Sequence, residues 1–167
     1  NQVSDAIKKY EMLSVADKQR PSALTAVAGL YLSNQEWGKA REIYQNLIGL
    51  FPDNIGFKIS RLKCLAELCD TNFKKDAAKI FSSLDKDELY RLLEAESIYA
   101  RKTDSLNSYL NELLERTQHN EKAIETHYQL MQVYADLGDS ENVIESEENY
   151  LKLSKKSASW KGAMWRL

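Results

Sequence analysis

Apolar residues recur with helical spacing along residues 21–54, in two runs separated by a polar break. The first run consists of Leu24, Val27, Ala28 and Tyr31. The second run consists of Ala40, Tyr44 and Leu47. Such positions share one face of a helix, so each run predicts an amphipathic helix. Pro52 ends the second helix, because it lacks a backbone N–H and disfavours helical geometry in the residue before it. The stretch therefore predicts a helical hairpin.

The same pattern, less regular in places, extends over the whole chain. Three residues near the start lie 34 positions before the second run and almost repeat it: Ala6, Tyr10 and Leu13. We therefore expect that the chain was cut from a longer one or begins with an unrecognised partner helix. The predicted segments of one domain, residues 1–167, are a half repeat (1–20), a repeat (21–54), degenerate repeats (55–85 and 86–120), a repeat (121–157) and a capping helix (158–167).

Polar residues mark the expected helix ends. Asn54 can cap a helix start with its side-chain oxygen, and Asp85 with Glu88 has the spacing of a capping box. Thr103 is the expected cap of a helix over 106–117. Gly138 can adopt the left-handed conformation that ends a helix.

The middle of the chain is the least regular part. Its first predicted stripe consists of Ile59, Leu62, Ala66 and Cys69, and its second of Ala77, Phe81 and Leu84. Leu106 then stands where the other hairpins have a small residue, which predicts wider helix packing there.

Composition excludes several function classes. The chain has 43% hydrophobic and 29% charged residues and a net charge of −2, which does not favour nucleic acid or an anionic membrane as partner. Cys64 and Cys69 are five positions apart on a predicted helix, too far for an unstrained disulfide. A reduced pair favours the cytoplasm. The sequence has no phosphate-binding loop or catalytic signature, and His119 and His127 lack the spacing of metal ligands. We expect no enzyme activity, cofactor or metal.

Taken together, the chain resembles the tetratricopeptide repeat (TPR) family from end to end, and the repeats that match well are 21–54 and 124–157. The resemblance implies an all-α fold, a right-handed α-α superhelix of about four to five hairpins, whose first helices line a concave groove. By position, the groove residues are Thr25, Gly29, Leu32, Ser33, Ser60, Cys64, Arg91, Ala95, Tyr128, Gln132 and Asp136.

The resemblance implies a scaffold or adaptor that binds a protein or peptide segment. Chaperone-binding members hold a terminal carboxylate with cationic residues, whereas the matching positions here are uncharged, so we do not expect a carboxylate clamp. Two alternatives are open. One is homo-oligomerisation through the open ends, with the half repeat at residues 1–20 and the tail with Trp160 and Trp165 as contact surfaces. The other is a regulatory or substrate-recruiting domain of a larger enzyme or of a secretion or assembly component. Tyr90, Tyr99, Tyr109 and Tyr128 are expected to be exposed contact residues.

Overall fold

The computed structural model describes residues 2–119 and 123–154, and its regular secondary structure over those ranges is entirely helical. The chain divides into two compact units between Leu84 and Asp85, within one residue of a predicted repeat boundary. None of the described helices is long and apolar enough to cross a membrane.

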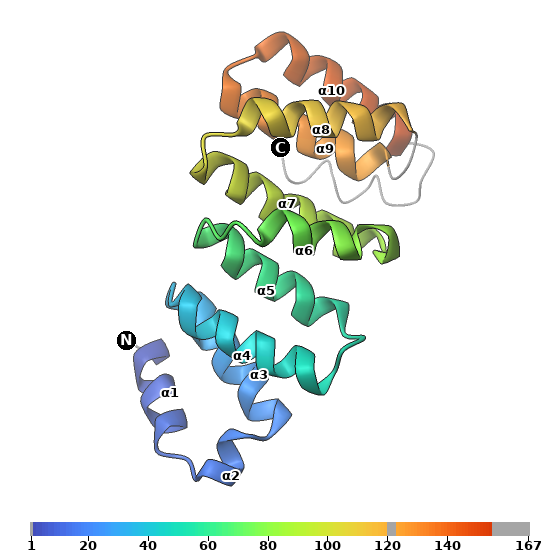
Figure 1. Ribbon diagram of the computed structural model, residues 1–167. Coiled ribbons are helices and arrows are strands. Elements are labelled where there is room, and N and C mark those ends of the chain that lie inside the picture. The colour runs from blue at the N-terminus through green and yellow to red at the C-terminus, as the bar shows by residue number, and fades with distance from the viewer. Residues whose placement is uncertain (1, 120–122, 155–167) are drawn as a thin grey trace. The chain divides into compact units, whose positions relative to one another are not determined.

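The first unit is a series of helices packed mainly against their neighbours in sequence (Figure 1). Its elements are α1 (Gln2–Glu11), α2 (Val15–Lys18), α3 (Pro21–Ser33), α4 (Trp37–Leu50), α5 (Ile55–Glu67), α6 (Phe73–Ile80) and the 3-10 turn η1 (Phe81–Ser83). Both predicted runs of residues 21–54 are buried, and they form one core cluster with Ile7 and Cys64. This cluster joins α1, α3, α4 and α5.

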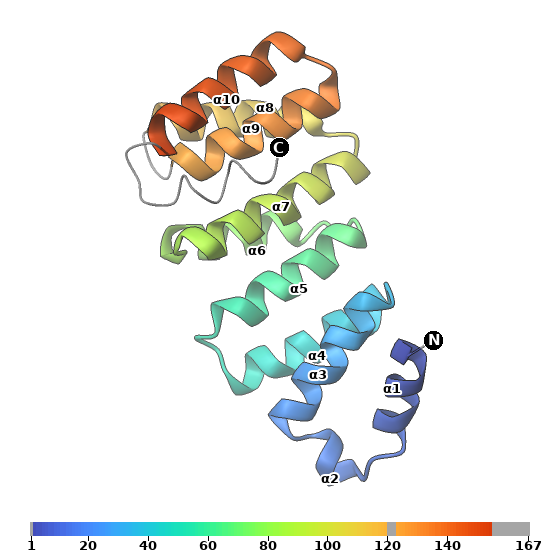
Figure 2. The ribbon, with the colours of Figure 1, turned by 180° about the vertical axis from the view of Figure 1, so that it is seen from behind.

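The second unit contains α7 (Lys86–Lys102), α8 (Leu106–Gln118), α9 (Ala123–Leu137) and α10 (Ser140–Ser154). Helices α9 and α10 form a hairpin and lie side by side, as Figure 2 shows. Helix α9 also packs against α7 and α8. The core of the second unit includes Leu89, Leu92, Leu113 and Leu130.

The turn inside each hairpin has the same backbone geometry. Gln35, Cys69, Asp104 and Gly138 all have positive φ, between 53° and 76°, and they follow one another after 34 or 35 positions. In each turn the next residue donates a backbone hydrogen bond, 2.8–2.9 Å long, to the carbonyl five positions before it. This is the Schellman motif that ends a helix. The hairpins of both units therefore share one turn register, including those that the sequence showed as degenerate.

The predicted caps are confirmed at Asn54, which accepts from the N–H of Phe57 at 3.0 Å, and at Asp85, which forms the complete capping box with Glu88. Gly138 has the predicted left-handed conformation. The predicted capping helix at 158–167 lies outside the described residues.

Three predictions at helix ends were wrong. Leu13 follows the end of α1 and is 41% exposed, because α1 stops at Glu11. Cys69 is exposed in the turn after α5, because that helix ends in the left-handed conformation there. Thr103 ends α7 and does not cap α8.

The α7–α8 hairpin also differs from the prediction in which residue occupies the position where its helices cross. Leu106 is only the first residue of α8. In the turn register, Tyr109 occupies the place of Ala40, and it is 3% exposed. A large aromatic residue thus fills the position where the first hairpin has a small one.

Candidate functional site

The predicted groove residues of α3 lie on its accessible side. Thr25 and Ser33 are exposed, and Gly29 and Leu32 are half-buried. The Thr25 hydroxyl donates to the carbonyl of Pro21 at 2.8 Å, and that of Ser33 donates to the carbonyl of Gly29 at 3.0 Å. Because both hydroxyl hydrogens are used within the helix, this surface offers hydroxyl oxygens and methyl groups but no charge.

The prediction for α5 needs correction. Ser60 is half-buried, but the Cys64 side chain is fully buried in the core cluster, so it cannot line a groove. The reason is the turn register: with a spacing of 34 positions, Lys63 and Glu67 are the counterparts of Gly29 and Ser33. Both are half-buried on α5. At Cys64 the prediction was therefore one position out of this register.

In the second unit, the predicted residues lie on α7 and α9. Arg91 is exposed, and Ala95 is 1% exposed, so the Ala95 side chain is also not available to a partner. On α9, Tyr128 and Gln132 are half-buried. Asp136 accepts from Nε of Arg101 on α7 at 2.7 Å. An ion pair thus holds the last predicted groove residue.

Three tyrosines form a row across α7, α9 and α10. The ring centroids of Tyr90 and Tyr128 are 5.5 Å apart, and those of Tyr128 and Tyr150 are 5.8 Å apart, with tilted ring planes. The Tyr90–Tyr128 contact lies near the starts of α7 and α9, and the Arg101–Asp136 ion pair lies near their ends. Helices α7 and α9 therefore run parallel. Tyr128 is therefore the centre of a packed aromatic row and not an isolated contact residue.

Tyr109 was expected to be exposed, which was wrong. Its hydroxyl donates to the carbonyl of Leu93 at 3.1 Å. Burial, with a further contribution from Glu96, raises its pKa well above the usual value. It is part of the core.

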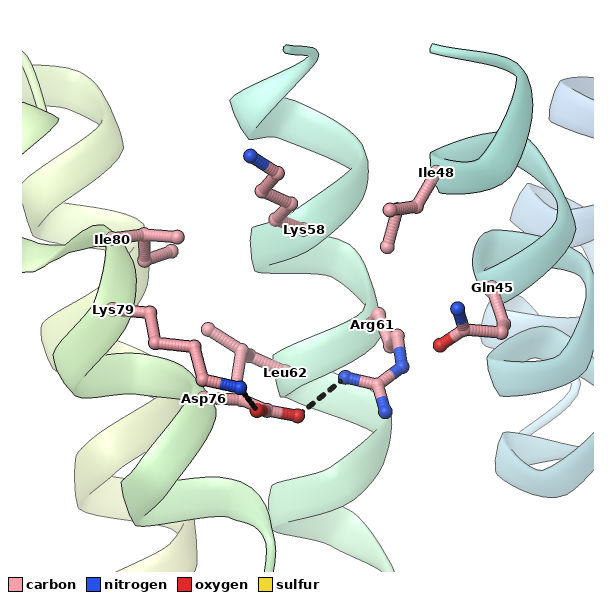
Figure 3. A pocket seen from close by; sticks show the side chains of 8 residues that line it. All are labelled: Gln45, Ile48, Lys58, Arg61, Leu62, Asp76, Lys79 and Ile80. Atoms are coloured by element: carbon pink, nitrogen blue, oxygen red, sulfur yellow. Dashed lines mark hydrogen bonds and ion pairs between the residues drawn. The ribbon is translucent and has the colours of Figure 1, made fainter. Parts of the chain in front are cut away.

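A pocket of about 360 Å³ lies among α4, α5 and α6 (Figure 3). Its lining consists of Gln45, Ile48, Lys58, Arg61, Leu62, Asp76, Lys79 and Ile80. Asp76 accepts from Arg61 at 2.9 Å and from Lys79 at 2.7 Å. The hydrogen bond from Lys79, followed by that from Arg61, lowers the pKa of the Asp76 carboxyl despite its partial burial. Sequence reasoning missed this pocket, although the three-residue spacing of Lys58 and Arg61 already indicated a shared helix face.

The groups that could carry covalent or metal chemistry are placed unfavourably. Burial raises the pKa of the Cys64 thiol to about 11, so little of it is nucleophilic thiolate near neutral pH. Burial lowers the pKa of His127, while Glu145 opposes that shift. Within residues 2–119 and 123–154, no three side chains among His, Cys, Asp and Glu come together as metal ligands.

No protein-family model, curated protein or solved structure matches the chain.

Proposed function

We propose that the chain is a TPR-like helical-repeat module that binds a segment of a partner protein on its first helices. The right-handed superhelical stacking and the scaffold or adaptor role are part of this proposal. The observation that carries it is the left-handed turn residue that returns every 34 or 35 positions. A constant repeat length gives successive hairpins equivalent first helices, and such helices together form an extended binding surface.

The side chains on these helices favour a partner segment with polar and apolar groups. On α3 the accessible Thr25 and Ser33 are uncharged. On α9 the ring of Tyr128 and the amide of Gln132 are partly accessible. Tyrosine is enriched in protein interfaces because its ring gives a large contact area and its hydroxyl a hydrogen bond. Binding to helices already held by their neighbours costs little conformational entropy in the module.

Selection from a displayed peptide library tests the proposal. The native protein and the variant Thr25→Glu/Gln132→Glu are the baits, and the matched control is Asn46→Glu/Asn111→Glu, which adds the same charge on exposed positions of α4 and α8. We expect selected peptides to bind the native protein and the control alike, and to bind the first variant about tenfold more weakly. Equal affinity for all three proteins, with unchanged helical circular dichroism, contradicts binding on the first helices.

Self-association is a second candidate function. Met12 and Leu13, between α1 and α2, are 85% and 41% exposed, and Val15, the first residue of α2, is 74% exposed. Neighbouring exposed apolar side chains are typical of contact surfaces. Sedimentation of the native protein and of Val15→Asp at several concentrations tests this candidate. A concentration-dependent dimer that Val15→Asp abolishes supports it, and a native monomer at every concentration contradicts it.

A further inference from the structure

The pocket among α4, α5 and α6 arises from two substitutions within the repeat pattern. With the turn spacing of 34 positions, Lys58 and Arg61 of α5 are the counterparts of Leu24 and Val27 of α3. Leu24 and Val27 are 7% and 1% exposed and belong to the core cluster. Lys58 and Arg61 are only half-buried and line the pocket. Positions that close the core in the first hairpin therefore place two cations beside a cavity in the second.

The charges of the pocket do not balance. Lys58, Arg61 and Lys79 are cations, and Asp76 is the single carboxylate in the lining. Asp76 already accepts from both Arg61 and Lys79. The Lys58 ammonium group points away from these three groups in Figure 3. The lining thus carries a formal excess of two positive charges.

Arg61 retains donors suited to an oxyanion. Its Nη1 donates to Asp76, while its Nε–H is buried without an acceptor among the described residues. The edge formed by Nε and Nη2 is the one that binds a carboxylate with two parallel hydrogen bonds. Gln45 extends toward the guanidinium in Figure 3, and Gln45 is exposed, so it can move aside.

The rest of the lining is aliphatic. Ile48, Leu62 and Ile80 come from α4, α5 and α6, and the last two are 2% and 6% exposed. The volume, about 360 Å³, is at the small end of the about 300–1,000 Å³ typical of ligand pockets. Such a pocket suits one or two side chains and not a large cofactor.

From this geometry we propose a second binding site, for an acidic segment of a partner protein in which a carboxylate side chain stands beside an aliphatic one. The carboxylate binds the Nε–Nη2 edge of Arg61, the flexible Lys58 side chain on the same helix turns its ammonium group toward it, and the aliphatic side chain packs on Ile48, the half-buried aliphatic residue of the lining. Charge complementarity selects this occupant, because the excess of positive charge remains after Asp76 is paired. The site lies on α4, α5 and α6. Although α5 is the first helix of its hairpin, the site uses neither Thr25 nor Gln132, so Thr25→Glu/Gln132→Glu leaves it intact and the two proposals are tested separately.

The probe is the peptide acetyl-Leu-Glu-Leu-Glu-amide, titrated into nitrogen-15-labelled protein and followed by amide chemical shifts. The comparison peptide, acetyl-Leu-Gln-Leu-Gln-amide, has nearly the same shape without the charge. The variants are Lys58→Gln, which removes one cation, and Lys58→Leu/Arg61→Val, which installs the residues of the first hairpin. The matched control is Lys9→Gln, because Lys9 is exposed on α1 and outside the pocket.

We expect the Glu peptide to shift amides of α5 and α6 and to bind about tenfold more weakly to Lys58→Gln, in the range for loss of a charged hydrogen bond. It should no longer bind Lys58→Leu/Arg61→Val, and the Lys9→Gln control should match the native protein. The double variant is expected to fold, since its new residues already occupy the same positions of the first hairpin; its amide spectrum verifies this.

Four results overturn the proposal: no shifts at millimolar peptide, equal binding of the Gln peptide, unchanged affinity of Lys58→Gln, or the same shifts from inorganic phosphate at the same concentration. The last result assigns a simple anion site instead of a peptide site.

Discussion

The ion pair between Glu96 and Arg116 replaces an apolar contact of the repeat. Glu96 on α7 and Arg116 on α8 lie 69 positions after Val27 and Leu47, the distance between the turn residues Gln35 and Asp104. In the first hairpin, Val27 and Leu47 are 1% and 0% exposed. In the third, Arg116 donates to the carboxylate with two hydrogen bonds, of 2.6 and 3.1 Å. The side chains of Glu96 and Arg116 are 10% and 23% exposed.

The burial of both groups determines the size of the effect. The variant Arg116→Leu leaves the Glu96 carboxylate nearly buried without its partner, which costs about 3–5 kcal/mol of unfolding free energy. Replacing both residues by those of the first hairpin, in Glu96→Val/Arg116→Leu, removes the desolvation of both charges. Such replacements of buried pairs are neutral or stabilise by about 1–4 kcal/mol. We therefore expect the double variant to be at least as stable as the native protein, with a coupling energy of at least about 3 kcal/mol.

Urea unfolding of the native protein, both single variants and the double variant gives the four free energies. Because the chain forms two compact units, hydrogen exchange of the α7 and α8 amides must accompany the unfolding curves, so that the change is assigned to the second unit. If the double variant loses as much stability as the two single variants together, the two residues are not coupled and the reasoning fails.

Three further results are expected. Leu47→Ala should lower the unfolding free energy by about 2–5 kcal/mol, because Leu47 is 0% exposed. The control Leu50→Ala, at a 54% exposed position, should change it by less than about 0.5 kcal/mol. Similar losses for the two variants in urea unfolding would mean that the core register is wrong. A thiol reagent at neutral pH should modify the exposed Cys69 in the native protein. Cys64 is buried and its pKa is raised to about 11, so it should react only after urea unfolds the protein. Rapid reaction of two thiols in the native protein contradicts this burial. Burial lowers the pKa of His127 below its usual value of 6.5, so the unfolded chain binds the proton more readily and stability should fall as the pH drops below that value. His127→Gln should flatten this pH dependence of the unfolding free energy, and an identical slope in both proteins refutes the assignment.

Much of the fold could be predicted from local pattern. The helices of residues 21–54 and 123–154 follow from apolar periodicity, and the caps at Asn54 and Asp85 follow from the side-chain oxygens that accept the free N–H groups of a helix start. Each of these helices and caps depends on residues only a few positions away along the chain. A short segment of sequence is therefore enough to predict them.

The candidate site was predicted less well, because its residues depend on register between helices. Cys64 and Ala95 were placed on a groove, but both are buried. Moving the register by one position turns a helical side chain by about 100°, which is enough to exchange an accessible place for a core place. The left-handed turn at Cys69 sets the register of α5, and nothing in that residue type predicts positive φ.

The amino-acid sequence alone predicts the helical class, the repeat length of the clear hairpins and several helix ends, because these follow from local hydrogen bonding and from the burial of one helix face. The ion pair of Glu96 with Arg116, the row of three tyrosines and the pocket beside Lys58 and Arg61 become visible in the folded protein alone. In each case the side chains come from helices whose contact depends on how the hairpins pack. Packing is a property of surfaces brought together by folding, and no short stretch of sequence specifies it alone.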